Sequence, residues 1–226
     1  MFILNAAVDK DVKIPDLQEF TDYFNERRIK GFANTCLNFT WESLEHANPG
    51  IYDEAFLAYM RKIMISADNA GIKILLNPYF KNWSHNTGGE GAPEWTFQKC
   101  SFLTDKMRGF FPQMNPDNTK NYNALMMYTL FLNGNRYLPD VNIEGLPVQD
   151  WLQDHYIAAI KHCLRRLKNC NALCGISVMN IGEPGFACED GFNALTVRFT
   201  QSIREAGRSL SVFADGIPES EINKKI

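Results

Sequence analysis

The chain has 226 residues, a net charge of −3 from 23 basic and 26 acidic side chains, and 45% apolar residues. This length and apolar content predict a globular domain with a substantial core. The near-neutral charge, without a basic cluster, argues against a nucleic-acid partner. No apolar run approaches the ~18 residues of a membrane span, and the N-terminus lacks signal-peptide features, so we expect a soluble, cytoplasmic protein.

The cysteine pattern favours buried, reduced thiols over a disulfide framework. Most of the six cysteines fall inside apolar strand or helix patterns: Cys36, Cys100, Cys163, Cys170, Cys174 and Cys188. A zinc site built from the last three with His162 lacks a CxxC pair, so we expect no metal and no other cofactor. We interpret Cys188 as a plain loop cysteine, because no histidine lies nearby in sequence to activate it.

The first third of the chain alternates strands and helices. Residues 2–8 and 34–39 are typical of short apolar strands, and 72–76 of a buried strand that stops at Asn77-Pro78. Asp16 is placed to cap a first helix, and Asp53 and Glu54 put acids in the first turn of a second that Gly71 ends. Helical spacing groups Leu17, Phe20, Phe24 and Ile29 in the first, and Phe56, Leu57, Met60, Ile63, Met64 and Ala67 in the second.

The rest of the chain resumes this alternation after a long interruption. Periodicity weakens over 79–147, an inserted loop region in which we expect one helix within 121–132. Helical spacing then predicts a helix over 148–167 and another over 194–206, and short apolar runs predict a strand over 173–179 and a last strand over 210–214.

This order predicts a parallel sheet with right-handed crossovers. A closed eight-stranded barrel takes ~250 residues, whereas only about five strands are expected here. The fold class is therefore α/β, a partial (β/α)8 TIM barrel, with residues 1–226 as a single incomplete domain. An incomplete barrel exposes strand edges and apolar helix faces, so we expect self-association or a partner chain that completes the barrel.

Three stretches carry a family resemblance. They are "FTWESLEHANPGIYDEAFLAYM" (39–60), "NWSHNTGGEGAPEWTF" (82–97), and "NYNALMMYTLFLNGNRYLPD" followed by "GLPVQDWLQDHYIAAI". From about Pro15 to Gly185 the chain resembles the N-terminal part of glycoside hydrolase family five, in its endoglycoceramidase and fungal glucosylceramidase or sterylglucosidase branch. The resemblance implies a barrel that hydrolyses β-glycosidic bonds with retention, through two glutamates ~5 Å apart.

The resemblance also exposes departures from the family pattern. The nucleophile of the family ends a seventh strand, which lies beyond the strands predicted here. A supporting arginine of strand two falls on Cys36, and the Asp and substrate-contacting His after strand three fall on Asn77 and Tyr79.

The family's acid/base ends strand four within Asn-Glu-Pro, where this chain reads "MNIGEPG". Aligned without a gap, Ile181 replaces the glutamate. With a two-residue insertion, Glu183 becomes the acid, but the carboxyl then moves ~6–7 Å along the strand, far beyond a catalytic tolerance of ~0.5 Å. Glu183 is therefore either the candidate acid/base or a displaced, solvated loop carboxylate.

Other candidates carry similar alternatives. Asn180 would donate to a sugar hydroxyl or cap its strand. Trp83 and Trp95 would stack on sugar rings or fasten their own loop. Asp215, at the end of the last predicted strand, is a substitute carboxylate without an obvious partner. Trp41 and Glu42 are expected to hold the loop after strand two.

Together these patterns lead to the hypothesis of a glycoside-hydrolase-like protein related to retaining β-glucosidases of glycolipids, either glucosylceramide or steryl glucoside. Without the complete acidic pair, we expect weak or no hydrolysis. The alternatives are a non-catalytic carbohydrate-binding or scaffolding protein, and one half of a split glycosidase.

Overall fold

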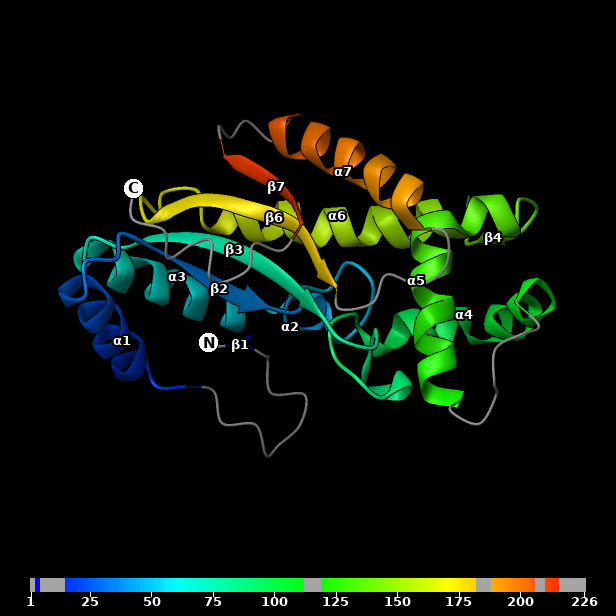
Figure 1. Cartoon of the computed structure of the whole chain (residues 1–226), viewed down its shortest axis with the longest axis horizontal. Helices are drawn as coiled ribbons and strands as arrows, with labels where there is room; N and C mark the ends of the chain where they lie inside the picture. Colours follow the sequence, from blue (N-terminus) through cyan, green and yellow to red (C-terminus); the bar gives the residue numbers. More distant parts are fainter. Residues whose placement is uncertain (1–2, 5–14, 112–118, 182–187, 206–209, 216–226) are drawn as a thin grey trace.

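The computed structural model describes residues 3–4, 15–111, 119–181, 188–205 and 210–215 (Figure 1). Five strands form one parallel sheet in the order β1 (Ile3–Leu4), β2 (Asn34–Phe39), β3 (Lys73–Phe80), β6 (Leu173–Ile181) and β7 (Ser211–Asp215). The connections that contain α3 (Glu54–Asn69), α6 (Val148–Arg166) and α7 (Cys188–Glu205) return the chain between strands. The predicted α/β class, with parallel strands and alternating helices, is confirmed.

The helices of the first half begin at the residues that cap them. Asp16 caps α1 (Leu17–Ile29) in a capping box with Glu19, and Asp53 accepts a hydrogen bond from the Phe56 amide, 2.8 Å away, at the start of α3 (Glu54–Asn69). All six predicted stripe residues of α3 are buried. The expectation for Ile29 was wrong: its side chain is 86% exposed, because it is the last residue of α1 and points away from the core.

The region 79–147 is more ordered than its weak periodicity predicts. It contains η1 (His85–Thr87), α4 (Glu94–Met107), η2 (Arg108–Phe110), α5 (Thr119–Tyr137) and a hairpin of β4 (Asn142–Ile143) and β5 (Leu146–Pro147). One further short helix, α2 (Trp41–Glu45), directly follows β2. The helix expected within 121–132 is longer than predicted, because α5 begins at Thr119 and continues to Tyr137 through a kink at Asn133.

Two predicted boundaries were wrong for identifiable reasons. Strand β3 does not stop at Asn77-Pro78 but runs on to Phe80, with Pro78 paired beside Phe39 of β2. Proline has no N–H to donate to a neighbouring strand, and the register between β3 and β6 shifts around Pro78, between Leu76 and Tyr79. Cys188 is not a loop residue, since it begins α7 (Cys188–Glu205), a turn and a half before the predicted start.

The core lies between the sheet and the helices α3 and α6 (Val148–Arg166). Alternate sheet residues, among them Leu37, Leu76 and Ile176, are 0–2% exposed. Tyr156 of α6 is fully buried and donates a hydrogen bond to the Val178 carbonyl of β6. Its ring lies 5.4–6.1 Å from four others, those of Trp41, Phe80, Phe131 and Phe199.

Helix α7 touches the kink of α5 through a glycine. A Cβ atom on Gly191 would lie 2.3 Å from the Leu132 carbonyl oxygen and 2.8 Å from Asn133 Oδ1. Only glycine allows this approach. No helix within the described ranges is both long enough and apolar enough to cross a membrane.

Candidate active site

The carboxyl ends of β2, β3 and β6 lie together, because parallel strands end at the same edge of a sheet (Figure 1). Ligands of α/β barrels and open parallel sheets bind at this edge, on the loops that follow the strands. The chain places α2 after β2, and a loop that leads to α4 after β3. We therefore expect a binding site at this edge.

A buried row of polar side chains crosses the sheet near this edge. Asn38, Asn77 and Ser177 come from β2, β3 and β6 and are at most 2% exposed. Asn77 Nδ2 donates to Asn38 Oδ1 over 2.7 Å, and the Ser177 hydroxyl donates to Asn77 Oδ1. The row lies on the sheet face opposite the helix-covered core, the face that points inward in a closed barrel. Its hydrogen bonds link the three strands to one another.

Two predicted site residues lie at the end of this row. Tyr79 and Asn180 are paired across β3 and β6, and both are half-buried. Tyr79 shares a strand face with Asn77, two residues earlier. Burial, and then the charge of Glu90, raise the pKa of the Tyr79 hydroxyl, so this group stays protonated and neutral. The structure thus brings Asn77, Tyr79 and Asn180 together, as parallel strand ends predict.

Trp83 lies inside the protein and not at a surface. Its side chain is 0% exposed, with Nε1 donating to Thr96 Oγ1 over 2.9 Å and its ring edge-to-face with those of Tyr128 and Phe131. Its backbone has a φ of 68°, which side-chain burial holds in place. These contacts leave no ring face for a sugar and fit the alternative that the loop is fastened by its own tryptophans.

Trp95 has a similar position. It is 5% exposed, donates from Nε1 to the Glu45 carbonyl over 2.8 Å, and packs edge-to-face against Trp41 and Trp151. Trp95 therefore joins the start of α4 to α2. The expectation that Trp41 holds the loop after strand two agrees with this packing.

Two carboxyl groups of α2 have perturbed acidities that sequence reasoning missed. Burial, and then the charges of Glu94 and Glu90, raise the pKa of Glu42 to about 7. Burial also raises the pKa of Glu45 to about 7, against the lowering effect of hydrogen bonds from the Gly50 amide and the Trp41 indole. The signal available in the sequence is two glutamates three apart in an otherwise apolar segment after a strand.

The structure does not describe the carboxyl groups of the two candidate acids, Glu183 and Asp215. Glu183 lies outside the described residues. Asp215 ends β7, where it pairs with Met179, but its side chain also lies outside the described set. Cys36, on which the supporting arginine of the family falls, is a half-buried residue of β2. Among the described residues, no three His, Cys, Asp or Glu side chains gather as metal ligands.

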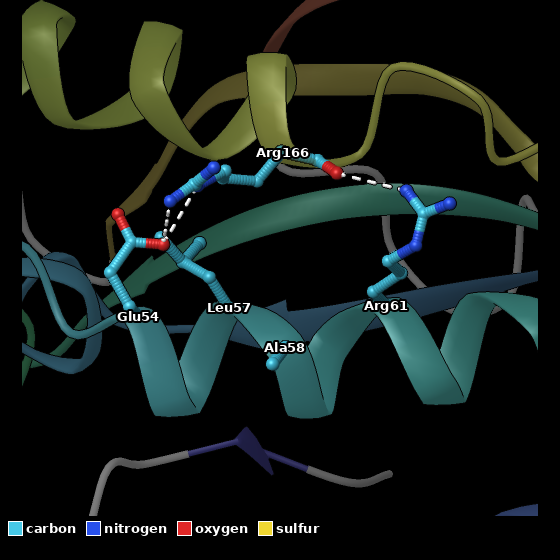
Figure 2. Close-up of a pocket in the computed structure, with 5 residues that line it drawn as sticks. All are labelled: Glu54, Leu57, Ala58, Arg61 and Arg166. Atoms are coloured by element: carbon cyan, nitrogen blue, oxygen red, sulfur yellow. Dashed lines mark hydrogen bonds and ion pairs between the residues drawn. The ribbon is translucent and has the colours of Figure 1, made fainter.

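A surface groove of about 330 Å³ lies between α3 and α6, away from the predicted site residues (Figure 2). Arg166 reaches from α6 to Glu54 on α3, with 2.7 Å between Nε and Oε2, and Arg61 donates to the Arg166 carbonyl over 3.2 Å. Leu57 and Ala58 line the groove between these groups. The groove contacts tie two outer helices together.

Comparison with known proteins gives relatives of one kind. The chain is 28% identical over 221 residues to a glucosylceramidase of Rhizopus delemar, covering 90% of this chain and 32% of that protein. It is 32% identical over 213 residues to an ergosteryl-beta-glucosidase of Saccharomyces cerevisiae, covering 79% and 28%. No protein-family model matches.

Solved structures agree. Sterylglucosidase 1 of Cryptococcus neoformans superposes with a TM-score of 0.61 at 27% identity, over 79% of this chain and 28% of that one. Endo-glycoceramidase II of Rhodococcus sp. superposes with a TM-score of 0.63 over 92% and 46%, at 21% identity, which shows the fold alone. The resemblance drawn from the sequence motifs is confirmed. The chain spans 22–32% of the length of the curated relatives that it matches.

Proposed function

We propose that this chain, a relative of glucosylceramidases and sterylglucosidases with part of the barrel of family-five glycosidases, binds a β-glucoside of a lipid at the carboxyl ends of β2, β3 and β6. The single observation that carries the proposal is the pair of half-buried side chains Tyr79 and Asn180, which lie beside the buried row from Asn38 through Asn77 to Ser177. Amide and hydroxyl groups on adjacent strand ends are the polar groups that orient a sugar in an otherwise apolar pocket. The lipid would be ceramide or a sterol, as in the names of the relatives.

We propose further that hydrolysis by this chain is weak or absent. The pairs Tyr79 with Asn180 and Phe80 with Ile181 continue the ladder to the end of β6 without a shift between them. The register shifts earlier, between Leu76 and Tyr79, but Ile181 remains paired at the end of the strand. This placement supports the ungapped alignment, in which Ile181 stands where the family has its acid. Without that acid or a nucleophile, the charged transition state of glycoside cleavage loses its main partners.

The test is a pair of measurements on the whole chain. Saturation-transfer NMR with octyl β-glucoside, kept below its micelle concentration, should show contacts that Asn180→Ala and Tyr79→Phe weaken and that Asp140→Asn, an exposed control, leaves unchanged. A fluorogenic β-glucoside should be hydrolysed slowly or not at all. Absence of glucoside contacts would refute the binding proposal. Turnover that Glu183→Gln abolishes would refute the proposal that hydrolysis is weak or absent.

Two alternatives predict other outcomes. A split glycosidase would gain turnover when a polypeptide with the later strands and their glutamate is supplied, and a partner or self-association at the open sheet edge would then be required. A carbohydrate-binding or scaffolding protein would bind without turnover even then. A cytoplasmic location stays a prediction, which a fluorescent fusion would test.

A further inference from the structure

Helix α2 (Trp41–Glu45) contacts residues 81–95, the segment after β3. We call these two segments together the clasp. The Glu42 amide donates to the Gly91 carbonyl over 2.9 Å. The Trp95 indole donates to the Glu45 carbonyl over 2.8 Å, and the rings of Trp41 and Trp95 meet edge-to-face at 5.5 Å. The clasp therefore links the segments that follow two neighbouring strands.

The Glu45 carboxyl lies in the centre of the clasp and is 0% exposed. It accepts hydrogen bonds from Trp41 Nε1, at 2.7 Å, and from the Gly50 amide. The Tyr52 phenol lies within reach of this charge: burial, and then the charge of Glu45, raise its pKa, while Arg165 lowers it. Among the described residues, no Lys, Arg or His forms an ion pair with Glu45. A charge on this carboxyl would be buried without a counter-ion, which is costly.

The Glu42 carboxyl faces two other acids, Glu94 at the start of α4 and Glu90 in the segment after β3. Glu94 Oε1 accepts from the Asn86 amide over 2.8 Å, while its Oε2 is buried without a hydrogen-bond partner in the described structure. The charges of Glu94 and Glu90, from two other parts of the chain, thus act on Glu42, and like charges repel. A proton on Glu42 removes part of that repulsion.

We propose that the clasp is a pH-sensitive element, closed while Glu42 and Glu45 carry their protons and loosened when both ionise. Both carboxyls have a pKa raised from 4.5 to about 7 by the folded structure. A raised acid pKa stabilises the fold fully below pH 4.5, and this contribution is lost as the pH rises through about 7. The opening therefore falls near neutrality, and acid keeps the clasp closed.

The clasp regulates the edge at which we place glucoside binding, and this part of the inference rests on the proposed function. Residues 81–95 directly follow Tyr79 and Phe80, and the Lys81 and Glu90 backbones pair at the base of the loop. When α2 releases residues 81–95, the segment next to Tyr79 changes its position. The affinity for a glucoside should therefore fall above pH 7.

Hydrogen exchange followed by mass spectrometry tests the clasp directly. Peptides covering 41–50 and 81–95 should lose protection by about tenfold or more between pH 5.5 and pH 8, after correction for intrinsic exchange rates. Glu42→Gln should reduce this loss, because the substitution removes the repulsion and, within the part of the chain that the structure describes, the Glu42 carboxyl accepts no hydrogen bond that would be lost. Asp140→Asn, an exposed carboxylate of the same charge, should respond like the wild type.

A protection pattern that does not change with pH would overturn the proposal, as would an unchanged pH response in Glu42→Gln. Glu45→Gln is a poorer variant, since an amide accepts with one oxygen and loses one of the two N–H bonds. Tryptophan fluorescence of the wild-type chain across the same pH range gives a second reading that needs no variant. Failure of glucoside binding at every pH would count against the proposed function and leave the exchange result untouched.

Discussion

The two faces of the central sheet are built from the same strands but differ in chemistry. On the helix-covered face, Leu76, Ile176 and Tyr156 are part of a continuous apolar core. On the opposite face, Asn77 and Ser177 hydrogen-bond in a row, and Phe213 of β7 remains 37% exposed. The period of two along a strand places these residues on opposite sides. One face is therefore a continuous apolar core, whereas the other combines a buried hydrogen-bonded row with a partly exposed aromatic ring.

The largest effect should come from the helix-covered face. Tyr156→Ala removes a fully buried ring that contacts four others, so the free energy of unfolding should fall by about 3–5 kcal/mol. Tyr156→Phe is the control: it loses only the hydrogen bond to the Val178 carbonyl, for about 1–2 kcal/mol. Urea denaturation measures both. A loss below about 1 kcal/mol for Tyr156→Ala would remove the distinction between the faces.

The polar row should give an intermediate effect. Asn77→Ala leaves Asn38 Oδ1 and the Ser177 hydroxyl without their partner, so we expect a loss of about 1–3 kcal/mol in the free energy of unfolding. Ser177→Ala removes one bond only and should cost about 1 kcal/mol. In the double variant the two losses should not add, because both act on one network. Strict additivity would contradict the idea of a connected row.

The smallest effect is expected at Phe213, an aromatic side chain on the open face. Phe213→Ala should lower the free energy of unfolding by less than about 1 kcal/mol, since the ring is already partly in water. The same denaturation experiment compares this variant with Tyr156→Ala, since both replace an aromatic side chain by alanine. A loss of equal size would show that the second face is packed as tightly as the first. Sedimentation of this variant would also show whether self-association uses this face.

The alternation of strands and helices was predictable because it depends on local patterns. The strand at 34–39 and the apolar stripe of α3 follow from short-range spacing, and both match. The helices α2 and α4 were missed, although Thr40 and Pro93-Glu94 are ordinary helix starts. Their apolar residues pack against distant segments and give little periodicity of their own.

The site was predictable only in part. The neighbouring positions of Tyr79 and Asn180 follow from the rule that parallel strands end together. The burial of Trp83 could not be predicted, because its partners Thr96, Tyr128 and Phe131 lie 13 or more residues away. The raised pKa of Glu45 depends on burial in the folded chain, against the lowering effect of hydrogen bonds from the Gly50 amide and the Trp41 indole.

The contact at Gly191 sets a mechanical limit on the far end of the molecule. Helix α7 rests its first turn on the backbone of α5 with no room for a methyl group, and the chain then runs on to β7. A larger residue there would meet the Leu132 carbonyl oxygen, and α7 would have to move away from α5. The absence of a side chain at Gly191 thus sets how closely α7 approaches α5, and α7 in turn packs against the strands β6 and β7.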